Sequence, residues 1–179
     1  MLIQLEHIQT VIALTTWVEQ ALTDAGLDPG QATVTSYTTG SVNDPRLEFE
    51  HTLKIGHRES EISWGNGLPA TMTDSDSAGP DFRVMFYFPV DAEDEAVIEL
   101  FYNSVDGVWD LHAQITYHDH SEAPPESVLV AARAAKWIQE LRHIPQTPDD
   151  DIDEELTIRS DDRAKAIIRQ LIGSIIQNA

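Results

Sequence analysis

The chain has no cysteine, and lysine is rare, with three among 179 residues. The absence of cysteine excludes disulfide frameworks, thiolate zinc sites, iron–sulfur clusters and cysteine nucleophiles. Positive charge is scarce overall, since 11 Lys and Arg stand against 31 Asp and Glu and give a formal net charge of −20. Because this charge repels nucleic-acid phosphates, direct binding of DNA or RNA is not expected.

Long apolar runs and targeting signals are also missing. No stretch approaches the roughly 20 apolar residues that a membrane helix needs, and residues 1–14 lack the positively charged start of a secretory signal. We therefore expect a cytoplasmic protein with no membrane contact. A length of 179 residues fits one domain whose core is large enough to need no metal or disulfide.

Common catalytic motifs do not occur in the sequence. It contains no Gly-x-Ser-x-Gly nucleophile turn, no phosphate-binding Gly-rich loop and no His-Glu-x-x-His pair. Carboxylates are so numerous that no pair is recognisable as a general acid and base. The sequence therefore gives no indication of an enzyme, and we expect no cofactor.

Apolar periodicity predicts an α+β fold. Residues 4–26 carry apolar side chains at three- and four-residue steps, and Pro124 opens a second helical pattern that runs to about residue 142. We predict a five- or six-stranded antiparallel sheet, with the N-terminal helix and one or two C-terminal helices packed on one face. A long loop is expected over residues 65–81. The predicted strands cover residues 31–39, 46–57, 83–88, 97–102 and 108–117, and a further short strand contains Ile62 and Trp64.

The composition changes near the C-terminus and predicts three parts. Residues 1–144 form the α+β domain, residues 145–158 an acidic linker containing the run Asp149-Asp150-Asp151, and residues 159–179 an amphipathic helix. Ser160 is a good N-cap for this last helix.

The last helix has a wide apolar stripe that permits two interpretations. The helix could pack onto the sheet of its own chain, or it could form a homodimer contact or exchange between protomers. The candidate contact residues are Ile168, Leu171, Ile172 and Ile175.

Histidines suggest a candidate metal site at the end of the strand that begins at Val108. His112, His118 and His120 fall on the polar side of this strand, and imidazole groups suit zinc, copper or nickel. The simpler interpretation is a solvent-exposed polar face on which the histidines bind no metal and lie at the end of the strand.

The acidic composition favours a non-catalytic protein-binding module, and no residue motif identifies a family. An inhibitor such as an immunity protein, or a chaperone, would use its negative charge to speed encounter with a basic protein partner. The alternatives are a metal-binding protein or metal-dependent enzyme that uses the histidines, and a nucleic-acid-mimicking inhibitor. The candidate partner-binding residues lie in acidic loops and runs: Asp74, Asp76, Asp81, Asp91, Asp94, Glu95, Asp149, Asp150 and Asp151.

Overall fold

A computed structural model of the chain describes residues 5–42, 44–57, 59–70, 79–89, 95–116 and 151–177. These residues form helix α1 (Leu5–Asp24), the short 3₁₀ helix η1 (Pro29–Gln31), seven strands and helix α3 (Asp161–Gln177). The strands are β1 Thr33–Ser41, β2 Asp44–Ile55, β3 Ser60–Pro69, β4 Asp81–Pro89, β5 Glu95–Asn103, β6 Val108–Thr116 and β7 Asp151–Ile158.

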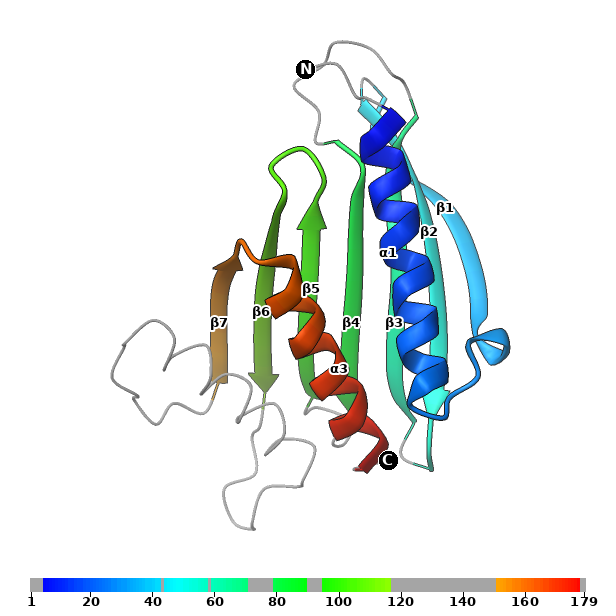
Figure 1. Cartoon of the computed structure of the whole chain (residues 1–179), viewed down its shortest axis with the longest axis vertical. Coiled ribbons are helices and arrows are strands. Elements are labelled where there is room, and N and C mark those ends of the chain that lie inside the picture. The colour runs from blue at the N-terminus through cyan, green and yellow to red at the C-terminus, as the bar shows by residue number, and fades with distance from the viewer. Residues whose placement is uncertain are drawn as a thin grey trace.

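The seven strands form one antiparallel sheet in the order of the sequence, from β1 at one edge to β7 at the other. Figure 1 shows α1 and α3 side by side on the same face of this sheet. We call the face under the helices the first face and the opposite one the second face. In the described part of the chain, neither helix has the length and apolar character needed to cross a membrane.

The core lies between the two helices and the first face. Alternate residues of the strands supply its largest buried side chains, because successive side chains of a strand point to opposite faces. The helices add apolar residues at three- and four-residue steps, such as Val11, Leu14 and Val18 of α1. The aromatic members of this core are Trp64, Phe82, Phe86, Phe88 and Trp109.

Local signals set the helix ends. Gly26 has a φ of 87° just after α1, and the Leu27 N–H donates to the Leu22 carbonyl at 3.0 Å, which closes the helix in the way that a left-handed glycine permits. At the start of α3, the Ser160 hydroxyl accepts a hydrogen bond from the Arg163 N–H at 3.3 Å. Both the predicted N-terminal helix and the predicted N-cap are therefore confirmed.

The α+β fold is confirmed, but the sheet has seven strands rather than five or six. One error lies in the predicted linker: residues Asp151–Ile158 form β7, which pairs with β6 along its whole length. The acidic composition of this segment is typical of a linker and gave no indication of a strand. The strand forms because it pairs with β6, which is distant in sequence. Residues 117–150 lie outside the described residues, including the predicted second helix and the rest of the linker.

The second difference concerns the long loop predicted over residues 65–81. The structure extends β3 to Pro69 and begins β4 at Asp81. Gly65 and Gly67 caused the error, since glycine usually weakens a strand. Here the close approach of β2 requires Gly65, because a Cβ atom would collide with the backbone carbonyl of Phe49.

Candidate functional site

The second face of the sheet carries most of the polar side chains that the strands contribute. The strand registers align one row of residues across all seven strands, which contains two acids, one arginine, one phenylalanine and one glycine, with a threonine at each end. In order from β1 to β7, the row is Thr35, Glu50, Gly65, Arg83, Phe101, Asp110 and Thr157.

Next to this row, two arginines and two acids form an ion cluster on β2 and β4. Arg46 pairs with Asp81, and its Nε lies 3.5 Å from Glu48 Oε1. The Arg83 guanidinium lies 3.9 Å from Glu48 Oε2 and donates a hydrogen bond to the Tyr37 hydroxyl at 3.1 Å. Glu48 and Asp81 are each only 9% exposed, so both carboxylates are largely removed from water, whereas the Arg83 side chain is 37% exposed. Such buried charges are tolerated only because each has a partner.

Burial changes the acid–base properties of the cluster. It raises the pKa of Asp81 to about 6, although the positive charge of Arg46 acts in the opposite direction; the negative charge of Glu48 raises it further. For Arg83, burial lowers the pKa, but the surrounding Tyr37, Glu50 and Glu48 outweigh it and the net direction is upward. Arg83 therefore stays charged, whereas Asp81 titrates in the weakly acidic range.

Gly67 makes room for this cluster on β3. A Cβ atom at Gly67 would lie 2.7 Å from Glu48 Oε2, 2.8 Å from Asp81 Oδ1 and 2.9 Å from Arg46 Nη2. The Gly67 N–H also donates to Asp81 Oδ1 at 3.1 Å. The absence of a side chain at this position therefore lets the three ionic groups meet above the strand.

Substitution Gly67→Ala is expected to lower the free energy of unfolding by about 1–3 kcal/mol, because the buried ion cluster must move to accommodate a methyl group. The matched control is Gly173→Ala in α3, where an added Cβ meets nothing within 4 Å. Alanine there should instead stabilise the protein by up to about 1 kcal/mol through helix propensity. Urea unfolding of both variants checks the prediction, and equal effects of the two substitutions would contradict it.

Beyond Arg83, β5 and β6 form an acidic and aromatic pocket of about 390 Å³ on the second face. Its lining consists of Glu99, Phe101, Asp110 and His112, and the register places Glu99 opposite His112 and Phe101 opposite Asp110. The Thr157 hydroxyl of β7 donates to Asp110 Oδ1 at 2.9 Å and so orients that carboxylate. Two carboxylates beside an aromatic ring can bind a cation by charge attraction and by contact with the ring face.

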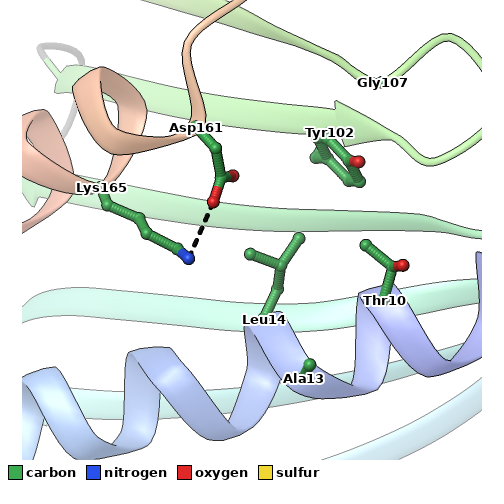
Figure 2. Close-up of a pocket in the computed structure, with 7 residues that line it drawn as sticks. All are labelled: Thr10, Ala13, Leu14, Tyr102, Gly107, Asp161 and Lys165. Carbon is green, nitrogen blue, oxygen red and sulfur yellow. Dashed lines mark ion pairs between the residues drawn. The ribbon is translucent and has the colours of Figure 1, made fainter.

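A second pocket of about 280 Å³ lies where α1, α3 and the β5–β6 hairpin meet (Figure 2). Its ionic groups are already partnered: Lys165 Nζ lies 2.8 Å from Asp161 Oδ2, and Asp161 Oδ1 accepts a hydrogen bond from the Trp109 indole N–H at 3.1 Å. Burial raises the pKa of Tyr102, and the charge of Asp161 adds to the effect. These contacts tie α3 to the sheet, which explains the pocket as a structural junction.

The structure places only some of the predicted partner-binding residues. Asp81 was predicted to lie in an exposed acidic loop, and this prediction is wrong. Asp81 begins β4 and is buried in the ion cluster, because the strand extends further than its glycine-rich surroundings indicate. Glu95 begins β5 and Asp151 begins β7. The other predicted residues lie outside the described part of the chain: Asp74, Asp76, Asp91, Asp94, Asp149 and Asp150.

The apolar stripe of α3 packs within its own chain. Its side chains are at most 2% exposed and belong to the common core, namely Ile168, Leu171, Ile172 and Ile175. Lys165 and Arg169 add cation–π contacts to Trp17 of α1, at 5.3 and 4.9 Å from the ring centroid. The interpretation in which the helix packs onto the sheet of its own chain therefore describes this structure; a homodimer contact or exchange through the stripe stays a prediction.

The candidate metal ligands are only partly placed. His112 lies in the acidic and aromatic pocket, whereas His118 and His120 are outside the described residues. Among the residues that the structure describes, no group of three His, Asp or Glu side chains is arranged to hold a metal ion. The metal site thus stays a prediction for the three histidines together.

Sequence reasoning did not single out Glu99, and it interpreted Phe101 as a core residue; the structure places both in the lining of this pocket. The signal that could have found them is the Asp106-Gly107 turn, where Gly107 has a φ of 66°. Counting outward from a two-residue Asp106-Gly107 turn would pair Glu99 with Gln114 and Phe101 with His112, on the correct face but two residues out of register. The structure has a four-residue loop over residues 104–107, which puts Glu99 opposite His112 and Phe101 opposite Asp110.

Comparisons with protein-family models, with curated proteins and with solved structures found no match for this chain. No relative therefore supplies an activity or a set of site residues. The function must therefore be inferred from the geometry of the second face.

Proposed function

We propose that this protein is a binding module for a basic protein partner and that the second face of its sheet is the contact surface. The observation that carries the proposal is the pocket of Glu99, Phe101, Asp110 and His112. An arginine or lysine side chain of the partner would enter it, with its charge between the two carboxylates and its stem or guanidinium plane against Phe101.

The net charge of −20 supports the same partner class. It attracts a basic surface over a distance of about a Debye length and speeds the first encounter, while the pocket supplies short-range specificity. The neighbouring ion cluster contributes in a different way. Arg46 and Arg83 are paired with Glu48 and Asp81, which reduces the repulsion that they exert on a cation in the pocket. Arg83 also lies close enough to Glu99 for the charge of that carboxylate to raise its pKa.

The first test is a titration of the full chain with a short arginine-containing peptide, followed by NMR. The amide signals of β5 and β6 around the pocket should move, and those at the exposed end of α1 should not. The variant Glu99→Gln/Asp110→Asn should bind the peptide at least about tenfold more weakly, because two charge-assisted contacts are lost.

The matched control is Glu6→Gln/Asp162→Asn, which removes the same two negative charges from exposed positions on α1 and α3. Both double variants differ from the wild type by the same two charges. At about 50 mM salt the control variant should nevertheless retain most of the affinity for the peptide, because its pocket is intact. If both double variants lose affinity to the same extent, binding depends on total charge and the pocket has no part in it.

The native partner is sought by co-purification from the host at low and moderate salt with the wild-type chain and both double variants as baits. A stoichiometric basic protein that is released by salt, retained by the control and lost with Glu99→Gln/Asp110→Asn would support the proposal. A partner held equally by all three baits would place the contact elsewhere.

A further inference from the structure

The two edges of the sheet differ in a way that points to self-association through β1. Among the described residues, β1 has β2 as its only neighbouring strand, so along Thr33–Gly40 the outer edge of β1 faces no other strand of the sheet. All nine of its residues are exposed, which means that neither face of the strand is covered. An exposed strand edge of this length is a template for pairing with another strand.

Proteins commonly protect such edges with charge, and here only one edge is protected. The edge strand β7 has the sequence DIDEELTI, with four acids among eight residues, whereas β1 has the sequence TVTSYTTGS and no charged residue or proline. In a chain with a net charge of −20, β1 is therefore a segment along which two copies can approach without direct repulsion between opposed side chains.

Exposed apolar side chains also lie along this edge, on both faces of the strand: the register puts Val34 opposite His51 on the first face and Tyr37 opposite Glu48 on the second. The described residues include five large apolar side chains that are exposed, and three of these lie on β1 or directly after it: Val34 at 60%, Tyr37 at 38% and Val42 at 98%. Exposed apolar surface of this kind is typical of a contact region. Its coincidence with the uncharged strand edge favours a protein contact over a merely solvated strand.

We propose that two copies of this chain pair antiparallel through β1 and form one continuous sheet about a two-fold axis at Tyr37. Such an axis places Tyr37 opposite itself, Ser36 opposite Thr38 and Thr35 opposite Thr39 of the second copy. The five positions from Thr35 to Thr39 are then neutral and opposed by residues of similar size, and the surface is complementary to itself, as in an isologous contact. This dimer leaves the second-face pocket on β5 and β6 free, so it is independent of the proposed partner binding.

Sedimentation of the full chain tests the proposal. The wild type should sediment as a dimer of about 40 kDa, twice the 20.0 kDa of the chain, at about 100 µM. The variant Ser36→Lys/Thr38→Lys places lysine against lysine twice and should weaken dimerisation at least about tenfold, although it reduces the overall negative charge. Ser36→Lys/Thr38→Glu places opposite charges against each other in the same register and should retain the dimer.

A cross-link tests the axis itself, since the chain has no cysteine of its own. Tyr37→Cys should form a disulfide-linked dimer on mild oxidation, because the Cα atoms of a directly opposed antiparallel pair are about 4.5–5.5 Å apart, which is within the Cα separation of disulfides. Thr39→Cys is the control, with its counterpart four residues away along the strand and out of disulfide reach. A monomeric wild type, or a dimer that the double-lysine variant leaves intact, would overturn the proposal.

Discussion

Replacing Ile168 by alanine is expected to lower the free energy of unfolding by about 2–5 kcal/mol, the largest effect that we predict for a single substitution. Ile168 is 0% exposed and belongs to the core between α3 and the sheet. Truncation removes three buried carbons and leaves a cavity that the surrounding packed core can fill only in part. Urea unfolding followed by circular dichroism measures the loss.

Ile12→Ala is the matched control, because it makes the same chemical change in the other helix at a side chain that is 51% exposed. It should cost less than about 1 kcal/mol. If instead Ile168→Ala changed the oligomeric state and hardly affected stability, the apolar stripe of α3 would be an intermolecular contact. The packing of α3 on its own sheet would then be wrong.

Replacing Asp81 by asparagine is expected to change how stability depends on pH. Folding raises the pKa of Asp81 from 3.8 to about 6, so between these values the folded protein binds more protons at this site than the unfolded chain does. Stability from this group is therefore full below about pH 4 and is lost as the pH rises to about 6. The loss amounts to about 3 kcal/mol, since each pKa unit corresponds to about 1.4 kcal/mol.

Asparagine resembles the protonated acid and has no proton to lose in this range. The difference in unfolding free energy between the wild type and Asp81→Asn should therefore shift by about 3 kcal/mol against the wild type between about pH 4 and pH 7. Asp162→Asn, at an exposed position in the first turn of α3, is the control and should show a nearly constant difference. If the difference in unfolding free energy between the wild type and Asp81→Asn were also independent of pH, folding would not raise the pKa of Asp81.

The candidate site shows why sequence reasoning reached only part of the second face. Asp110 and His112 could be placed on one polar side of a strand from alternation alone, since that property is local. Glu99 and Phe101 belong to the neighbouring strand, and only the register of β5 on β6 brings them into the same pocket. Arg46 and Asp81 are 35 residues apart, and no local pattern predicts their ion pair.

The sequence by itself determined the fold class, the N-terminal helix, the start of the last helix and most strands. These features follow from side-chain periodicity, caps and turn glycines, which act over a few residues. Tertiary structure alone decided that an acidic run becomes β7, that β3 continues through two glycines and that α3 packs within its own chain. In each case the stabilising contact joins segments far apart in sequence: the ladder from β7 to β6, the fit of Gly65 against β2, and the burial of Ile168 against the sheet.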